Sequence, residues 1–312
     1  MSHFADRLTE AVRQKGNALC VGLDPRWEQL PAELHARHGG TLRGAATAVE
    51  EFCARVLDVV APLVAVIKPQ CAFFELYGPA GLRALRHTLA KARRLGLVTI
   101  LDGKRNDIAS TATAYADAAF AGVTLAGRSR PVWDADALTV NPYLGRDAIE
   151  PFLASARRAE RGLFVLARTS NAGAGLFQDL VCDDKPLFLH VAEAVRAWTR
   201  EHRGQCGYGD VGAVVGATHP DELAAVRRAV PEAIFLVPGY GAQGGSATDV
   251  AAAFHNTGLG AIVNSSRGLT AGFPPSETEW EARVEAATRA AIADLRQATP
   301  MQALGKKLEV KS

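Results

Sequence analysis

The sequence contains few cysteines, and none has the spacing of a disulfide framework or a zinc site. The five cysteines are widely separated and include no C-x-x-C pair: Cys20, Cys53, Cys71, Cys182 and Cys206. Disulfide scaffolds carry even numbers of cysteines at short intervals, and cysteine-based zinc sites use close pairs. We therefore exclude both classes and expect a protein of the reducing cytoplasm.

Long hydrophobic runs are also lacking, as is an excess of charge of one sign. No apolar stretch approaches the roughly 20 residues of a membrane-spanning helix, and residues 1–16 carry charges at helical spacing rather than the apolar region of a signal peptide. The formal net charge is +2, with acidic and basic residues mixed along the chain. This composition predicts no nucleic-acid-binding stripe and no membrane-surface helix, but it is compatible with small anionic ligands.

No composition shift and no Pro/Gly-rich linker divides the 312 residues. Because 48% of the residues are hydrophobic, the chain can bury a large core. We expect one domain over residues 1–312, with an N-terminal helix and a short basic tail at residues 301–312. Residues 26–43, which include Pro31 and two adjacent glycines, are predicted to form a long loop.

Short apolar segments recur along the chain and alternate with Ala-, Glu- and Arg-rich segments of helical periodicity. The strand-like segments are residues 18–23, 64–67, 97–101, 137–140, 163–167, 211–215, 234–237 and 261–263. The helix-like segments include residues 45–60, 81–95, 185–202 and 220–230. Alternation of this kind predicts an α/β protein with a parallel sheet, and eight strands are the number that closes a (β/α)8 TIM barrel. A doubly wound open sheet is the alternative.

Charged residues gather where the third predicted strand ends. The apolar residues 97–101 are followed at once by Asp102, Lys104 and Asp107. Because side chains alternate along a strand, Asp102 and Lys104 are expected to project to the same side, with Asp107 in the loop that enters the next helix. Lys68 follows the second strand. Since the carboxyl ends of barrel strands share one face, we expect these four side chains to converge there.

A glycine-rich segment follows the seventh predicted strand. The spacing Gly239-x-Gly241-x-x-Gly244 formally matches a dinucleotide-binding fingerprint. That fingerprint belongs to the first strand of a fold and has an acidic residue about 20 positions further on, where this chain has Asn264. We therefore reject dinucleotide binding.

The same region predicts a phosphate site. The loops after the seventh and eighth strands of a barrel commonly bind phosphate, and backbone N–H groups of a glycine-rich loop can approach an anion closely. We expect backbone contacts from Gly241, Gly244 and Ser266. Gln243 would donate an amide hydrogen bond, and Arg267 a bidentate, charge-assisted one.

Together these residues resemble the orotidine 5′-phosphate decarboxylase family. The segments that carry the resemblance occur in the family's order and cover nearly the whole barrel: Asp24, Lys68, Asp102-x-Lys104-x-x-Asp107-Ile108, Thr169-Ser170-Asn171, residues 238–245 and Arg267. The chain length and residues 142–147 resemble the longer bacterial subgroup. Asn106 and Ala172 stand where that subgroup commonly has glycine and proline, and these departures bear on loop conformation.

The resemblance implies conversion of orotidine 5′-phosphate to uridine 5′-phosphate and CO2, the last step of pyrimidine nucleotide synthesis, with no metal and no organic cofactor. It also implies a homodimer in which Asp107 and Thr111 reach the other subunit's site. The implied catalytic residues are Lys68, Asp102, Lys104 and Asp107. The implied substrate contacts are Asp24 to the ribose, Ser170 to the pyrimidine, Thr111 across the interface, and Gln243 and Arg267 to the phosphate.

The chemistry gives Lys104 a role that can be argued separately. Loss of CO2 from C6 leaves a carbanion in the plane of the ring, where resonance helps little. A nearby ammonium gains on the order of 4 kcal/mol at an effective dielectric constant of about 20, and it can then protonate C6. A carboxylate at Asp102 would repel the substrate carboxylate until CO2 departs. Two lysines and two aspartates sum to zero charge, which makes a buried array tolerable.

Three other functions are weighed against this one. A Mg²⁺-dependent sugar-phosphate decarboxylase or aldolase of the same barrel type resembles the Asp-x-Lys-x-x-Asp stretch, but Lys68 would repel a metal there. A Schiff-base aldolase needs a lysine with a depressed pKa, whereas flanking aspartates favour the charged ammonium. A non-catalytic nucleotide-phosphate binder would not need a charged array, and a turnover assay distinguishes it.

Overall fold

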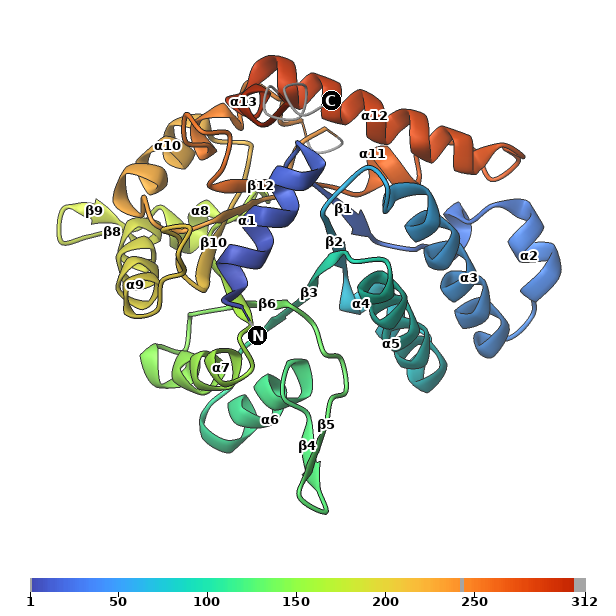
Figure 1. Cartoon of the computed structure of the whole chain (residues 1–312), viewed down its shortest axis with the longest axis horizontal. Coiled ribbons are helices and arrows are strands. Elements are labelled where there is room, and N and C mark those ends of the chain that lie inside the picture. The colour runs from blue at the N-terminus through green and yellow to red at the C-terminus, as the bar shows by residue number, and fades with distance from the viewer. Residues whose placement is uncertain (1, 242–243, 306–312) are drawn as a thin grey trace.

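The computed structural model describes residues 2–241 and 244–305, and its eight main strands form one closed parallel barrel (Figure 1). The strands are β1 (Leu19–Leu23), β2 (Val66–Pro69), β3 (Val98–Arg105), β6 (Ala137–Val140), β7 (Gly162–Arg168), β10 (Val211–Val215), β11 (Phe235–Val237) and β12 (Ala261–Ser265). Around the barrel their order is β1, β12, β11, β10, β7, β6, β3, β2. The predicted TIM barrel is therefore confirmed, since each strand overlaps its predicted segment, and the open sheet is excluded.

Amphipathic helices surround the barrel and bury one face against it, as Figure 1 shows. The longer ones are α3 (Leu42–Val60), α5 (Gly78–Arg94), α6 (Ala109–Ala119), α7 (Arg146–Arg158), α9 (Leu187–Glu201), α10 (Pro220–Ala229) and α12 (Trp280–Ala298). The shorter elements are α4 (Cys71–Glu75), α8 (Gly175–Gln178), η2 (Ala251–Ala253) and α11 (Arg267–Thr270), with the hairpins β4 (Val123–Leu125) to β5 (Arg128–Arg130) and β8 (Val181–Cys182) to β9 (Lys185–Pro186). Among the described residues, no helix combines the length and apolarity needed to cross a membrane.

Helix α1 (Phe4–Lys15) lies across the N-terminal end of the barrel (Figure 1). The Phe4 ring lies over Gly162, the first residue of β7, so closely that a Cβ atom there would come within 2.2 Å of it. The same ring meets Phe164 edge-on at 6.2 Å between centroids. This packing leaves the C-terminal ends of the strands as the open end of the barrel.

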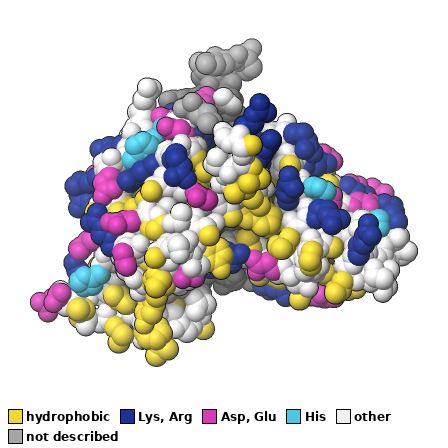
Figure 2. Space-filling model, turned by 90° about the horizontal axis from the view of Figure 1, so that it is seen from below, with side chains coloured by type: hydrophobic (Ala, Val, Ile, Leu, Met, Phe, Trp, Pro, Cys, Tyr) yellow, Lys and Arg dark blue, Asp and Glu magenta, His cyan; other side chains and the backbone are white. Residues whose placement is uncertain are grey.

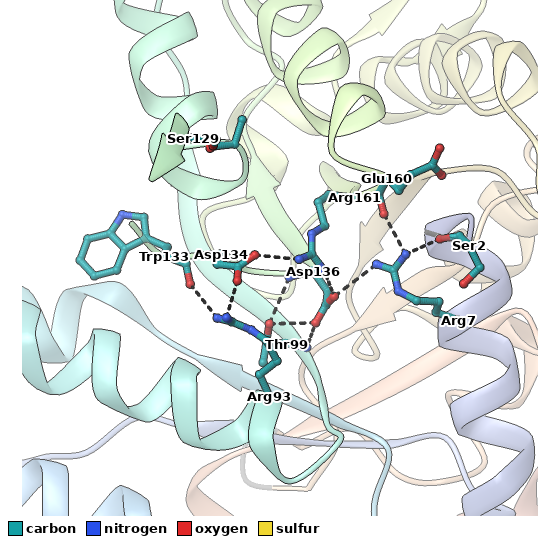
Figure 3. Close-up of polar contacts among 11 residues, drawn as sticks. Ser2, Arg7, Arg93, Thr99, Ser129, Trp133, Asp134, Asp136, Glu160 and Arg161 are labelled. Atoms are coloured by element: carbon teal, nitrogen blue, oxygen red, sulfur yellow. Dashed lines mark hydrogen bonds and ion pairs between the residues drawn. The ribbon is translucent and has the colours of Figure 1, made fainter. Parts of the chain in front are cut away.

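A charged network also holds the N-terminal end together (Figure 3). Asp136, directly before β6, accepts hydrogen bonds from the Thr99 backbone N–H at 3.0 Å and the Thr99 hydroxyl at 3.1 Å. Arg7 of α1 reaches the same carboxylate at 3.2 Å, and Arg161 also pairs with it. The network ties α1 to β3 and β6 and lies at the end opposite the predicted site.

The prediction of a long loop over residues 26–43 is wrong. This segment forms a 3-10 turn η1 (Trp27–Gln29), helix α2 (Ala32–His38) and the start of α3. Pro31 stands at the N-cap of α2 and Gly39 at its C-cap, so both mark helix ends rather than continuous loop. The Leu34 side chain is completely buried, and this burial fixes the helix against the core.

The prediction of a tail over residues 301–312 is also wrong for its first residues, 301–305. Met301 is fully buried, and its sulfur accepts a hydrogen bond from the Ala18 backbone N–H at 3.1 Å. Helix α13 (Gln302–Gly305) follows. Residues 306–312 lie outside the described part of the chain.

Candidate active site

A cavity of about 790 Å³ lies at the C-terminal end of the barrel, and every strand contributes to its wall. The contributing residues, taken in the order of the strands around the barrel, are Asp24 directly after β1, Asn264, Leu236, Val214, Leu166, Thr139, Asp102 with Lys104, and Lys68. In this ring the charged residues come from three neighbouring strands. The strands opposite place the aliphatic Leu166, Val214 and Leu236 on the wall, while polar residues such as Thr169 and Ser170 follow β7. The polar, uncharged Thr139 and Asn264 separate the charged arc from the apolar arc.

Asp102 is the centre of the charged arc. Its Oδ2 atom accepts hydrogen bonds from Lys68 Nζ at 2.6 Å and from Gln70 Nε2 at 3.0 Å. Its Oδ1 atom accepts from Lys104 Nζ at 2.7 Å and from the Thr139 hydroxyl at 2.9 Å. Four donors therefore saturate the carboxylate and hold two ammonium groups on its two sides. The predicted convergence is confirmed for Lys68, Asp102 and Lys104, whereas Asp107 does not join them within one chain.

Burial differs between the two lysines. The side chains of Lys68 and Asp102 are 6% and 7% exposed, whereas the Lys104 side chain is 45% exposed. A fully buried ion pair is held in place by its surroundings, but a half-exposed ammonium in a cavity can also reach a ligand. Of the two lysines, Lys104 is therefore the one that is accessible to a substrate.

The backbone of β3 places Lys104 by an irregularity and not by simple alternation. Opposite β6, Leu101 pairs with Leu138 and Arg105 pairs with Val140, so three residues of β3 face the single residue Thr139. Lys104 has a φ of 44°, in the left-handed region that costs a non-glycine residue roughly 1–2 kcal/mol. The strand also continues to Arg105, beyond the predicted strand end at residue 101. This bulge turns the Lys104 side chain back onto Asp102.

Lys68 and Asp102 each stabilise the charged form of the other. Burial alone would raise the pKa of Asp102, but the ammonium groups of Lys68 and Lys104 lower it well below its usual value. Burial alone would lower the pKa of Lys68, but Asp102 and Asp24 raise it above its usual value. Neither Asp102 nor Lys68 therefore changes its charge near neutral pH.

Other predicted site residues lie around the same cavity. The Oδ1 atom of Asp24 is buried and has no hydrogen-bond partner in the described part of the chain, and the same holds for Oδ1 of Asn264. Ser170 lines the cavity against Gly216, where a Cβ atom would come within 2.9 Å of it. Arg267 is exposed at the start of α11 and also lines the cavity. The unpartnered oxygens of Asp24 and Asn264 can accept hydrogen bonds from hydroxyl groups of a ligand.

Two predicted residues lie outside the cavity of the single chain. Asp107 is partly exposed, and its Oδ1 atom accepts a hydrogen bond from the Ile108 backbone N–H at 2.8 Å. Thr111 is exposed on α6. Neither residue contributes to the cavity wall of its own chain.

The structure describes only part of the predicted phosphate loop, because residues 242–243 lie outside the described residues. The Gly241 N–H donates to the Gly245 carbonyl at 2.8 Å, and the Gly244 N–H donates to the Gly241 carbonyl at 2.9 Å. These two groups would have to exchange partners to bind an anion. Ser266 lines the cavity beside Arg267, and Gln243 lies outside the described residues.

Sequence reasoning missed Thr139 and Gln70 as members of the site. Both bind the Asp102 carboxylate directly. Gln70 follows Lys68 by two positions, and Thr139 is a polar residue in an otherwise apolar strand, so each carried a signal. The signal was weak because a hydroxyl or amide at a strand end is common without such a role.

Within the described residues, the groups that could ligate a metal lie away from this cavity. They are His3 with His202 and Asp210, and Cys182 with Asp183 and His190. In the cavity, both oxygens of Asp102 are already occupied by ammonium groups. The donor set therefore does not fit a divalent cation beside Lys68.

The fold and the site define a class: a TIM-barrel protein with an alternating lysine and aspartate array in its cavity. Residues 17–280 match the model of the family described as Orotidine 5′-phosphate decarboxylase / HUMPS family, and the chain belongs to this family.

Named relatives extend the match over most of the chain. A protein named orotidine 5′-phosphate decarboxylase from Rhodopirellula baltica is 48% identical over 296 residues, which cover 92% of this chain and 97% of the relative. The protein of the same name from Caldicellulosiruptor bescii is 40% identical over 273 residues, covering 86% and 90%.

Solved structures with the same kind of name are similar to this chain in fold and sequence. The OMP decarboxylase of Leishmania donovani is similar with a TM-score of 0.74 at 35% identity, over 96% of this chain and 98% of that one. A putative orotidine-monophosphate-decarboxylase from Toxoplasma gondii gives a TM-score of 0.79 at 31% identity, over 97% and 98%.

Proposed function

We propose that this chain is a carboxy-lyase that converts orotidine 5′-phosphate to uridine 5′-phosphate and CO2 in pyrimidine nucleotide synthesis. The observation that carries the proposal is the array of Lys68, Asp102 and Lys104 in the barrel cavity of a chain that belongs to this family. The array offers a substrate one accessible ammonium beside one buried carboxylate.

The reaction uses the array in two ways. The substrate carboxylate lies next to Asp102, where two negative charges repel each other until CO2 leaves. The ammonium of Lys104 stabilises the carbanion that forms at C6 and then donates a proton to it. Lys68 holds Asp102 in place from the buried side, at 2.6 Å, so that the carboxylate cannot turn away from the substrate.

The rest of the nucleotide has matching groups around the cavity. Asp24 accepts hydrogen bonds from ribose hydroxyls through its unpartnered oxygen. Ser170 contacts the pyrimidine, and Arg267 with Gln243 and the loop after β11 binds the phosphate. Binding of the phosphate, far from the reacting carbon, orients the ring against Lys104.

The direct test is turnover by the purified, chelator-treated protein. Incubation with orotidine 5′-phosphate is expected to produce uridine 5′-phosphate, followed as loss of substrate absorbance. Activity that appears only when Mg²⁺ is added, and only with sugar phosphates, would favour the metal-dependent alternative. Tight binding of uridine 5′-phosphate without turnover would favour the non-catalytic binder.

We also propose that two copies form a homodimer in which Asp107 and Thr111 complete the partner's site. Large hydrophobic side chains are exposed in the same region, on and around α6 and the β4–β5 hairpin: Ile108, Tyr115, Val123, Leu125 and Val132. Figure 2 views the side toward which this hairpin projects in Figure 1, and hydrophobic side chains lie there between the charges. Exposed hydrophobic side chains that gather in one region favour association, and twofold pairing is the commonest form.

Mixing two inactive variants tests the shared site. If each site takes Lys104 from one subunit and Asp107 from the other, a dimer of one Lys104→Ala and one Asp107→Ala subunit has one intact site. A statistical mixture is then expected to recover roughly a quarter of the wild-type rate. The measurement is the decarboxylation rate after the two variants are unfolded together and refolded. Absence of recovery in demonstrably mixed dimers would contradict the role of Asp107.

Arg267→Ala is expected to weaken binding of phosphate-bearing ligands. Loss of charge-assisted hydrogen bonds should reduce the affinity for uridine 5′-phosphate about 10- to 100-fold, while the affinity for uridine changes little. Calorimetric titration with both ligands measures the difference. The matched control is Arg289→Ala on α12, which removes an exposed arginine outside the cavity wall. Equal losses for both ligands would contradict a phosphate-specific role.

A further inference from the structure

Thr139 is buried in β6, and its side chain makes two hydrogen bonds within the charged array. The residue is 1% exposed. Its hydroxyl donates to Asp102 Oδ1 at 2.9 Å and accepts from the backbone N–H of Lys104, also at 2.9 Å. One oxygen atom thus contacts the carboxylate of one proposed catalytic residue and the main chain of the other.

The second of these bonds replaces a missing strand contact. Between Leu101 and Arg105 the register of β3 against β6 is broken, and Lys104 adopts its left-handed conformation inside this bulge. A backbone N–H in a bulge has lost its regular ladder partner, and a buried one needs another acceptor. The hydroxyl of Thr139 is that acceptor, so it stabilises the conformation that turns Lys104 toward Asp102.

From these contacts we infer that Thr139 is a positioning residue, which fixes the distance between the Lys104 ammonium and the Asp102 carboxylate; the inference rests on the proposed function. Without the hydroxyl, the Lys104 N–H in the bulge has no acceptor, and Asp102 loses one of its four donors. The contact between Lys104 Nζ and Asp102 then depends on the half-exposed lysine side chain alone. The ammonium then samples positions away from C6. Because the loss concerns placement rather than binding, it falls on the chemical step.

The N-terminal end of the barrel supplies a matched control. Thr99 is also 1% exposed, and its hydroxyl also joins a carboxylate and a backbone N–H, donating to Asp136 Oδ2 at 3.1 Å and accepting from the Asp136 N–H at 3.1 Å (Figure 3). It carries the same chemistry at the end of the barrel opposite the cavity. A purely structural role of a buried threonine would affect Thr99 and Thr139 variants alike.

The test compares Thr139→Val, Thr139→Ser and Thr99→Val in the full chain. Valine keeps the shape of threonine without the hydroxyl, and serine keeps the hydroxyl. Thr139→Val is expected to lower kcat about 10- to 100-fold, since displacement of a catalytic group by roughly 1 Å costs that much. KM and the affinity for uridine 5′-phosphate should change less than about threefold, because the phosphate and ribose contacts are untouched. Thr139→Ser should recover most of kcat, and Thr99→Val should lose thermal stability while keeping kcat.

Two results would overturn the inference. One is a folded Thr139→Val variant with wild-type kcat, and the other is an equal loss of kcat in Thr99→Val. If Thr139→Val does not fold, the smaller Thr139→Ala takes its place in the same comparison. A wild-type protein that does not decarboxylate orotidine 5′-phosphate would instead refute the proposed function. In that case a crystal structure of Thr139→Val decides the positioning role: Lys104 Nζ is expected to leave Asp102, and an unchanged contact would contradict it.

Discussion

Lys104→Ala is expected to abolish decarboxylation while leaving the barrel folded. The substitution removes the accessible ammonium beside Asp102 and, with it, both the stabilisation of the C6 carbanion and the proton donor. An electrostatic contribution on the order of 4 kcal/mol together with general acid catalysis predicts a loss in kcat/KM of at least about 10⁴-fold. Because the Lys104 side chain is 45% exposed, its removal disturbs little of the core.

The measurement is the rate of orotidine 5′-phosphate decarboxylation, with circular dichroism and uridine 5′-phosphate affinity as checks on the fold. Lys91→Ala is the matched control, because Lys91 on α5 also forms an ion pair at 2.6 Å, with Asp58, but lies outside the cavity. This control should keep the wild-type rate. Near-wild-type turnover by Lys104→Ala would show that another group protonates C6.

Asp102→Asn is expected to inactivate the protein and also to destabilise it. The variant leaves Lys68, 5% exposed, without a negative partner at Asp102, and breaking a buried pair in this way costs about 3–5 kcal/mol. Urea unfolding measures the stability and the decarboxylation assay measures the activity. Asp136→Asn is the control: it breaks a buried carboxylate network at the opposite end of the barrel, so it should lower stability and keep kcat. An Asp102→Asn variant as stable as wild type would contradict the pairing.

The stability difference between wild type and Asp102→Asn should depend on pH in a defined direction. The folded-state pKa of Asp102 is lowered, so its contribution is present above the unfolded value of about 4 and is lost as the pH falls below it. The folded-state pKa of Lys68 is raised, so the contribution of its charge is present below the unfolded value of about 10.4 and is lost as the pH rises through the folded value. The difference is therefore largest between these limits.

Much of the barrel and the core of its site could be predicted from the sequence. Strand periodicity depends on local burial, so the eight strands were found in order, and charges that follow buried strands of a parallel barrel must meet at one end. This is why Lys68, Asp102 and Lys104 could be placed together. The same reasoning failed for α2, where Pro31 and Gly39 mark helix ends and were taken as signs of a loop.

The remaining features depend on contacts that no local pattern encodes. The hydrogen bond that the Lys104 N–H donates to the Thr139 hydroxyl joins residues 35 positions apart, and it depends on the bulge of β3 against β6. The alternation of side chains along a regular strand does not indicate that Lys104 adopts a left-handed backbone conformation. Asp107 and Thr111 present a different problem, because their proposed site belongs to another copy of the chain. One sequence does not show how far these residues lie from the site of a second copy.

The division of the cavity wall into a charged arc and an aliphatic arc gives the barrel a built-in direction. Leu166, Val214 and Leu236 carry no dipoles that could turn to oppose the lysines and aspartates across from them, so on that side only loop residues such as Ser170 and Arg267 can respond to these charges. A flat, polar ring entering this space has lower energy in one orientation than when it is turned over. Under the proposed function, this asymmetry would act together with the phosphate contact in deciding which edge of a bound base meets the ammonium group.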